Sequence, residues 1–289
     1  MNPDTIRVFA GCDPNDCDLE QMMVLEHSMR KHASLPVDIT WVRLSRNPQS
    51  FWYSNPQADA ATGVGWRTER WATPFSALRW AIPELCHFEG RAIFMDTDMI
   101  VLSDIAELWR TPIRESAVFA ARHDEGFQRF CIMLWDCAAA RRVLPSLAQL
   151  RADPETHNKL KKHFEQHPEQ VQAMDPAFNS IDGDGQPAER IKVLHYSDMG
   201  TQFSHPYAFA RLKAEGRPHW FDGKVMPHPR RDLSALFDRE YREALAAGRS
   251  PEQYRNPEPY GPLVKKSERR HAGNTVTRGA RSWFGLKLR

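Results

Sequence analysis

The chain has 289 residues, of which 41% are hydrophobic and 26% are charged, and its net charge is +2. This is the composition of an ordinary globular protein, and it argues against a nucleic-acid partner held by bulk positive charge. The length suits one large domain or two small ones. The five cysteines form no C-x-x-C pair. Because their number is odd, a closed disulfide framework is not expected, and a reducing, cytoplasmic setting is.

Several familiar signatures are absent from the sequence. The N-terminal residues MNPDTIRVFAG contain no basic segment followed by a long apolar core, so no signal peptide is expected. No apolar run approaches the roughly 20 residues that a membrane-spanning helix needs. There is no phosphate-binding loop ending in Gly-Lys-Ser/Thr and no Gly-x-Ser-x-Gly elbow. These absences argue against an ATP- or GTP-driven engine.

The first 44 residues predict an α/β domain. Residues 6–10 (IRVFA) indicate a strand that ends at Gly11, and residues 18–32 repeat apolar side chains at helical spacing. Asp18 is placed to cap this helix. Residues 37–44 alternate as a second strand. This strand–helix–strand order is typical of an α/β fold with a mostly parallel central sheet flanked by helices.

The middle of the chain carries further elements and one long irregular segment. Residues 46–73 have no period and are rich in Pro, Asn, Gly and aromatic side chains, which indicates a long functional loop. An exposed, polar helix is expected within 152–172, and short helices and turns are expected after Pro206. The other expected elements are strands at 92–95, 116–121, 131–135 and 191–194 and helices at 74–86 and 138–151.

Two carboxylates, Asp96 and Asp98, follow the apolar strand at 92–95 and precede a second apolar run. Acidic side chains between buried segments need compensation by a metal ion, by a basic partner or by water at a strand end. If the backbone turns there, both reach one hard cation, such as Mn²⁺ or Mg²⁺, which binds carboxylates together with substrate phosphates. His195 also ends an apolar strand and offers an imidazole to the same ion, with His219 as its rival. The alternative for all these residues is a structural role.

The block FMDTDMIVLSDIAELW at 94–109 is similar to the metal-binding region of retaining family 8 glycosyltransferases, whose pattern is YLDxDxxVxxDIxxLW. This family includes glycogenin and bacterial lipooligosaccharide galactosyltransferases, so a place in lipopolysaccharide biosynthesis is among the expectations. The resemblance implies the GT-A fold of nucleotide-diphospho-sugar transferases, with a mostly parallel central sheet. It implies a catalytic, donor-binding domain at 1–205, a helical extension packed on it at 206–262, and a basic tail at 263–289.

The resemblance also implies an activity and its residues. We expect a metal-dependent glycosyltransferase that moves a sugar, with retention, from a UDP-sugar to a glycan or a lipid-linked saccharide. The implied ligands of Mn²⁺ (or Mg²⁺) are Asp96, Asp98 and His195. The implied donor contacts are Ala10, Gly11, Cys12, Asp13, Arg79, Asp96, Thr97, Asp98 and Gly200. The implied catalytic or sugar-positioning residues are Arg79, Asp175 and Asn179, for which a surface salt bridge and an Asp-Pro turn are the structural alternatives.

The sequence departs from the family pattern at three places. The lysine that contacts the diphosphate in the family is absent after Gly200, where Thr201-Gln202-Phe203 follows. The family pattern GxxLxN ends in Asn, and this chain has Asp136 at that position. The Gln of the family pattern DQDxxN falls near Asp175 in this chain. These departures leave two other functions open. One is a non-catalytic domain that binds a sugar nucleotide or a glycan, and the other is a metal-dependent nucleotidyl- or phosphotransferase.

The segment 263–289 ends in RSWFGLKLR, which interleaves basic and apolar residues. Such a segment is able to rest on an anionic membrane surface, where lipid-linked acceptors lie. A peripheral contact at the inner face of the membrane and a disordered basic tail are therefore the two expectations for it.

Overall fold

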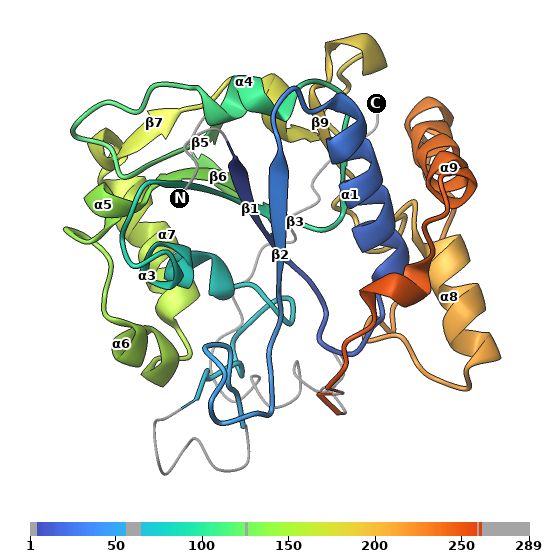
Figure 1. The fold of residues 1–289 in the computed structure, drawn as a ribbon, viewed down its shortest axis with the longest axis horizontal. Coiled ribbons are helices and arrows are strands. Elements are labelled where there is room, and N and C mark those ends of the chain that lie inside the picture. Colours follow the sequence, from blue (N-terminus) through green and yellow to red (C-terminus); the bar gives the residue numbers. More distant parts are fainter. Residues whose placement is uncertain (1–4, 56–64, 125–126, 259, 262–289) are drawn as a thin grey trace, which may run out of the picture.

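The computed structural model describes residues 5–55, 65–124, 127–258 and 260–261, and Figure 1 shows a central sheet with helices gathered on both sides. Six strands lie in the order β2-β1-β3-β6-β5-β7. They are β1 (Ile6–Gly11), β2 (Val37–Val42), β3 (Arg91–Asp96), β5 (Phe119–Asp124), β6 (Phe127–Asp136) and β7 (Val171–Ala173).

The six-stranded sheet is mostly parallel, as the sequence predicts. Strand β1 is parallel to β2 and β3, and β5 is parallel to β7, whereas β6 is antiparallel to both β3 and β5. The carboxyl ends of β1, β3, β5 and β7 and the amino end of β6 therefore meet at one edge. In open α/β sheets this is the edge at which ligands bind.

A smaller, three-stranded sheet begins just after the acid pair, and one of its strands, β9, ends next to these acids. Its order is β4-β9-β8, and β4 (Met99–Val101) is the apolar run that follows Asp98. The partner strand β9 (Val193–His195) is antiparallel to β4, with His195 opposite Met99. Strand β8 (Ser180–Ile181) lies parallel to β9. The turn between β3 and β4 thus places the end of β9 beside the acids.

The helices form two groups (Figure 1). On one side, α1 (Leu19–His32) packs with α8 (His205–Ala214) and α9 (Arg231–Ala246). The other helices of the described residues are α3 (Ile82–Leu85), α4 (Ile105–Trp109), α5 (Cys137–Ala140), α6 (Leu147–Ala152) and α7 (Thr156–Gln166). Short 3-10 turns lie at Leu78–Ala81, Pro168–Gln170, Pro176–Asn179, Ala188–Arg190 and Pro251–Tyr254.

The aromatic segment within 46–73 contributes to the core where the structure describes it. Trp52, Trp66 and Trp71 are each at most 9% exposed and belong to one hydrophobic cluster with Trp80. Trp52 and Trp66 stack with 6.1 Å between their centroids. Because large rings dominate the energetics of a core, these three tryptophans anchor the segment to the sheet. Residues 56–64 of this segment lie outside the described part of the chain.

The helix predicted over 138–151 is wrong, because two separate helices, α5 and α6, stand there. Pro145 interrupts the helical spacing: it has no N–H to donate, and it disfavours helical geometry in the residue before it. Ser146 then begins α6 through a reciprocal capping box with Gln149. The capping residues, rather than the apolar spacing, decide where this second helix begins.

The expectation that Asp18 caps α1 is also wrong. Asp18 precedes α1, but its carboxylate makes no hydrogen bond to the helix. The side chain instead lies 3.2 Å from His219 Nε2 and accepts a hydrogen bond of 3.2 Å from Trp220 Nε1. This carboxylate therefore ties the loop before α1 to a segment about 200 residues away.

The C-terminal helices share a core with the first helix. Leu233 and Phe237 of α9 pack with Val24 of α1 in one buried cluster. Glu240 of α9 is fully buried and pairs with Lys31 of α1 at 2.9 Å. Residues 263–289, for which a membrane-surface segment or a disordered tail is expected, lie outside the described residues. Among the residues described, no helix is both long and apolar enough to cross a bilayer.

Candidate functional site

The edge at which the strands end collects the residues that the sequence singles out. Gly11 at the end of β1 lies beside Asp96 at the end of β3 in the parallel register. In the antiparallel pair of β3 and β6, Met95 lies opposite Ile132. Continuing this register by one residue puts Cys131 beside Asp96. Asp96 thus lies between the end of β1 and the Cys131 position within β6.

Asp98 and His195 form the second half of the site. The distance between Asp98 Oδ1 and His195 Nε2 is 3.2 Å, and the two side chains are 14% and 6% exposed. Gln202 donates through Nε2 to the other oxygen of Asp98 at 2.8 Å. The Tyr196 N–H donates to the Asp98 carbonyl at 3.1 Å. The imidazole and the amide together hold the Asp98 carboxylate toward the end of β9.

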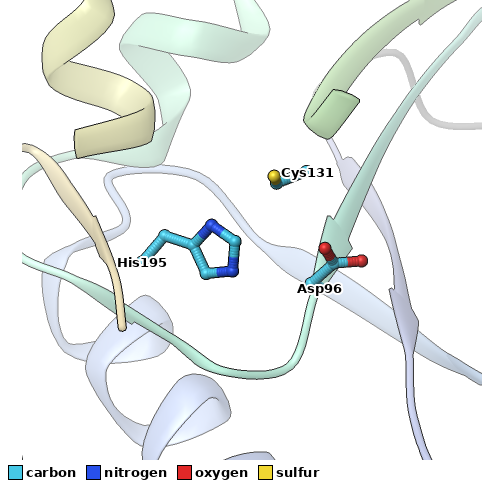
Figure 2. Close-up of side chains that lie close together, drawn as sticks. All are labelled: Asp96, Cys131 and His195. Carbon is cyan, nitrogen blue, oxygen red and sulfur yellow. The ribbon is translucent and has the colours of Figure 1, made fainter. Parts of the chain in front are cut away.

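Figure 2 shows Asp96, Cys131 and His195 converging from β3, β6 and β9 on a common space. One ligand atom from each of these side chains lies within 4.8 Å of the other two. His195 Nδ1 is buried, and none of the described residues forms a hydrogen bond with it. Carboxylate, imidazole and sulfur are the usual donors to divalent metal ions in proteins. With Asp98 beside them, the residues present therefore fit a metal ion.

Burial and charge shift the acid–base properties of this cluster. Burial raises the pKa of Asp96 to about 6, while the charge of Arg79 lowers it and that of Asp98 raises it. Burial lowers the pKa of His195, but Asp98 and Cys131 outweigh it, so the net pKa lies well above its ordinary value. A bound cation would favour the ionised carboxylates and the neutral imidazole. The site is therefore electrostatically suited to exchange protons for a metal ion.

Arg79 is a buried cation beside the first acid, and not a residue of a surface salt bridge. Its Nη2 donates to Asp96 Oδ1 at 2.9 Å, and its Nε donates to the Ser76 carbonyl at 2.9 Å. Its Nη1 donates to the Phe130 carbonyl. The side chain is only 8% exposed. These contacts fix the guanidinium at the edge of the site, where its role toward a substrate stays a prediction.

A chain of hydrogen bonds links the acid pair to α1. Thr97 Oγ1 donates to the Gly11 carbonyl at 3.2 Å and lies 3.3 Å from Gln21 Oε1. Gln21 Nε2 donates to Gln202 Oε1 at 2.9 Å, and Gln202 in turn holds Asp98. The chain is buried, so each amide is oriented by its neighbours. The Thr97 hydroxyl is therefore already hydrogen-bonded within the protein, and the donor contact expected at this residue stays a prediction.

Comparison with known proteins identifies the fold. No family model matches the sequence. Protein CDI of Arabidopsis thaliana is 32% identical over 120 residues, which is 41% of this chain and 41% of that protein. The chain therefore aligns with less than half of this relative's length.

Solved structures extend the likeness over most of the chain. The galactosyltransferase LgtC, determined with donor and acceptor sugar analogues, is 12% identical, with 86% of this chain and 99% of that chain covered and a TM-score of 0.55. The bifunctional glycosyltransferase WbbM is 14% identical, with 84% of this chain and 50% of that chain covered and a TM-score of 0.52. The chain has the GT-A fold. The resemblance drawn from residues 94–109 is thereby confirmed at the level of fold.

Within the GT-A fold, the last residues of β1 and the residue after it are packed tightly into the protein. Ala10 and Cys12 are both 0% exposed, so their side chains belong to the core. A Cβ on Gly11 would lie 2.9 Å from Cδ2 of Phe75. Packing against this ring therefore requires glycine here, and the position is more than a plain turn. Backbone groups here are engaged as well, since the Cys12 N–H donates to the Val42 carbonyl at 3.0 Å and the Gly11 carbonyl accepts from Thr97 Oγ1. The donor contacts expected at Ala10, Gly11 and Cys12 stay predictions.

Asp13 differs from these neighbours because it places a charge in the core. Its Oδ1 accepts from the N–H groups of Asn15 at 2.7 Å and Cys17 at 3.1 Å, while its Oδ2 is buried without a partner. Burial and the nearby Asp18 raise the pKa of Asp13 to about 7, against the lowering effect of the two N–H donors. One carboxylate oxygen is thus left for a donor that the described residues do not supply.

The residues predicted for the sugar end lie farther along the second sheet. Asp175 accepts a hydrogen bond from Ala177 N at 3.0 Å, and its exposed carboxylate lies 3.3 Å from Lys192 Nζ. Lys192 lies just before β9, and His195 is the last residue of that strand. Asp175 therefore contacts the start of β9, whereas the cluster of Asp96, Cys131 and His195 lies at its end. Asn179 is fully buried, and both of its amide atoms lack partners. Their predicted roles stay predictions.

Gly200 lies in a tight turn with a second segment against it. Its N–H donates to Asp198 Oδ1 at 2.9 Å, and its carbonyl accepts from the Met226 N–H at 2.8 Å. A Cβ on Gly200 would lie 3.5 Å from the Lys224 carbonyl oxygen. The fold thus brings the backbone of Lys224 beside Gly200, the glycine after which the family pattern has a lysine and this sequence does not.

Sequence reasoning misses two residues that contact this site. Cys131 stands beside Asp96, and the residue was singled out only as the start of a strand. Asp182 is 3% exposed and directly follows β8. Its N–H donates to the His195 carbonyl at 3.0 Å, and its carboxylate lies 3.1 Å from His228 Nε2. Position after a strand, which indicated Asp96 and His195, is the signal that points to Asp182. Cys131 lies inside β6, so no such signal marks it.

Proposed function

We propose that this protein is a metal-dependent glycosyltransferase that moves a sugar from a UDP-sugar to a glycan or lipid-linked acceptor, with retention of configuration. One observation carries the proposal. Asp96, Asp98 and His195, from three separate strands or turns, meet at the ligand-binding edge of a GT-A fold. A purely structural role would not require two acids and an imidazole to be buried together, since buried charge is costly unless it is paired.

The metal would be held by Asp96, Asp98 and His195. When bound, Mn²⁺ or Mg²⁺ supplies Lewis-acid stabilisation of the charge that develops on a departing diphosphate. The protein's own contribution is orientation, because Gln202 holds one oxygen of Asp98 and leaves the other toward the imidazole. Arg79 holds Asp96 in the same way and adds a fixed positive charge at the edge of the site.

The nucleoside would lie at the end of β1. Asp13 supports this placement because its free, buried Oδ2 needs a hydrogen-bond donor, which a nucleoside N–H or hydroxyl would supply. For the diphosphate we propose Lys224, whose backbone lies against Gly200. It would replace the lysine that the family pattern has after the glycine. An ammonium is a sufficient partner for a phosphate group as a point charge.

The acceptor class rests on the likeness of fold. The galactosyltransferase LgtC was determined with both donor and acceptor sugar analogues, which supports a sugar acceptor for this chain. The basic and apolar tail at 263–289 supports a lipid-linked one at a membrane surface. Asp175 and Asn179 stay the proposed residues of the sugar end.

The experiment is a screen of UDP-sugars for UDP release, with Mn²⁺ and with chelator, in the presence of glycan acceptors. We expect release that needs both the metal and one donor sugar. Binding of UDP-sugars without any turnover would favour a non-catalytic sugar-nucleotide module. Release of pyrophosphate, or transfer of phosphate, would favour a nucleotidyl- or phosphotransferase and contradict the proposal. Asp38→Asn, a change at an exposed acid on β2, is the matched control for loss of a carboxylate.

A further inference from the structure

We propose that Cys131 is a ligand of the metal at this site, which makes the centre a mixed oxygen, nitrogen and sulfur site for a borderline-soft divalent ion such as Zn²⁺. This inference rests on the metal site of the proposed function, but not on sugar transfer. The strand register places Cys131 next to Asp96, and Figure 2 shows its sulfur facing the space that His195 and Asp96 share.

The distances suit coordination after a small adjustment. One ligand atom each from Asp96, Cys131 and His195 lies within 4.8 Å of the others. With metal–ligand bonds of about 2.0–2.3 Å, the donor atoms of a tetrahedral site lie roughly 3.5 Å apart. Side-chain rotations that bring each atom inward by about 1 Å therefore close the shell. Asp98, at 3.2 Å from His195, supplies the fourth protein donor or leaves its place to a substrate oxygen.

Cys131 differs from the other four thiols of the chain. Cys12, Cys17, Cys86 and Cys137 are buried, whereas Cys131 is half-buried at the site edge. A structural cysteine in a core is usually enclosed like a small hydrophobic residue. Cys131 is partly exposed and lies beside a carboxylate and a buried imidazole, to whose Nδ1 none of the described residues forms a hydrogen bond. Thiolate, imidazole and carboxylate are the groups that bind zinc together in proteins.

A second group of side chains that could bind a metal ion is already paired with a lysine. His27, Glu240 and Glu243 also lie within ligand distance of one another. Lys31, however, places its Nζ 2.9 Å from Glu240 and 2.6 Å from Glu243. The ammonium already neutralises these acids, so a divalent ion would have to displace it.

Sulfur changes which metal the site prefers. Sites with only oxygen donors suit Mg²⁺ and Mn²⁺, whereas thiolate selects zinc-class ions. On binding, the Cys131 thiol loses its proton to solvent and the thiolate forms the metal–sulfur bond. We therefore expect the ratio of Zn²⁺ to Mn²⁺ affinity to depend on Cys131, beyond the general tendency of zinc to bind more tightly.

The test is the absorption spectrum of the full-length protein titrated with Co²⁺, a coloured substitute for Zn²⁺. The wild-type complex should show intense thiolate-to-cobalt charge-transfer absorption in the near ultraviolet. Cys131→Ser should abolish this absorption, and Cys86→Ser, which removes a thiol outside the site, should retain it. In parallel calorimetry, Cys131→Ser should lower the Zn²⁺-to-Mn²⁺ affinity ratio by at least about tenfold, since even residues that only orient a ligand change affinity by this much.

Two outcomes overturn the inference. One is a wild-type cobalt complex that lacks charge-transfer absorption, a result that needs no variant and no assumption about folding. The other is an equal spectrum in wild type and Cys131→Ser, with circular dichroism confirming that both are folded. Cys131→Asp is a second variant, which should lose the absorption while keeping a ligand for Mn²⁺.

The same measurements separate this inference from the proposed function. If UDP-sugars turn over with Mn²⁺ but the cobalt spectrum shows no sulfur ligand, the glycosyltransferase proposal stands and Cys131 is only a neighbour. If the cobalt–thiolate absorption is present but no UDP-sugar turns over, Cys131 is a metal ligand and the proposed glycosyltransferase activity is wrong.

Discussion

The two ends of the candidate site are built alike but completed differently. At the end of the site where we propose a metal ion, the metal end, Asp98 lies 3.2 Å from His195. At the end where we propose the nucleoside, the nucleoside end, Asp18 lies 3.2 Å from His219. Each pair has a second buried acid nearby, whose pKa burial raises to about 6 for Asp96 and to about 7 for Asp13. One acid of each pair is therefore held by an imidazole, while the other is only partly compensated.

The difference lies in what surrounds the second acid. Asp96 has the guanidinium of Arg79 and shares its space with Cys131 and His195, which are potential metal ligands. Asp13 has only backbone N–H donors and one oxygen without a partner. We therefore propose a cation as the partner of the acids at the metal end and a hydrogen-bond donor as the partner of Asp13 at the nucleoside end. Two similar arrangements of acids and histidines would then serve different kinds of ligand.

The largest effect is expected when the charge of Asp98, the proposed anionic metal ligand, is removed. Asp98→Asn keeps the size and the contact with Gln202 but loses the anionic ligand. We expect Mn²⁺ affinity, measured by calorimetry, to fall by more than about 100-fold, since a ligand should matter more than residues that merely orient one. Asp38→Asn should bind Mn²⁺ as the wild type does. Unchanged binding by Asp98→Asn would make the acid pair structural.

The second change tests whether Arg79 compensates Asp96 in the absence of metal. Arg79→Ala leaves the buried carboxylate without its guanidinium, and we expect the free energy of unfolding to fall by about 3 kcal/mol. Arg70→Ala breaks an ion pair whose arginine is 57% exposed, and should change stability by less than about 0.5 kcal/mol. Urea unfolding of both variants in the presence of chelator measures the difference. If both variants lose the same small amount of unfolding free energy, the Arg79 guanidinium does not stabilise the buried Asp96 carboxylate.

At the nucleoside end, the corresponding test is pH. The pKa of Asp13 rises from 3.8 to about 7 on folding, so the folded state binds more protons between these values. Its contribution to stability is therefore lost as pH rises through this window. Asp13→Asn cannot ionise, so relative to the wild type it should gain on the order of 2 kcal/mol between pH 5 and pH 8. Urea unfolding at both pH values measures this, and a difference independent of pH would contradict the account.

A smaller effect is expected from the hydrogen-bond chain that orients Asp98. Gln202→Ala removes the 2.8 Å hydrogen bond to that carboxylate without removing a ligand. We expect Mn²⁺ affinity to fall by about tenfold, with the protein still folded. Gln172→Ala, on the edge strand β7, is the control. An affinity equal to that of the wild type would mean that His195 alone positions Asp98.

The smallest effect is expected at Lys224. Because its side chain is exposed, Lys224→Ala should weaken UDP binding by only about threefold, the value of a solvent-exposed charge contact. The effect should shrink in high salt, since exposed charges are screened. Lys213→Ala, on α8, provides the matched loss of an exposed lysine. If both variants bind UDP equally well, the segment at 222–226 does not reach the diphosphate.

Much of this architecture could be predicted from the sequence, because local patterns determine it. The strands at β1, β2 and β3 and the helix α1 follow directly from apolar spacing, and the rule that ligands gather at strand ends pointed to Asp96 and His195. The helix expected at 138–151 failed where Pro145 and the capping residue Ser146 outweighed the spacing. A local signal stronger than periodicity was present there and was not used.

The rest of the site depends on pairings that are distant in sequence. Cys131 reaches Asp96 only because β6 runs antiparallel to β3, and no spacing in the sequence reveals that register. The same holds for Asp18, which looked like a helix cap and is instead held by His219 and Trp220. Contacts of this kind come from tertiary structure, so the sequence indicates Asp96, Asp98 and His195 but not the neighbours that the fold adds to them.

The most direct test of the central claim is a calorimetric titration of the wild-type protein with UDP, with Mn²⁺ and with chelator. If the acid pair and His195 form a metal-dependent nucleotide-sugar site, UDP should bind well in the presence of Mn²⁺ and at least tenfold more weakly without it, about 1.4 kcal/mol or more. Equal affinity under both conditions would contradict the assignment of a metal to this edge of the sheet.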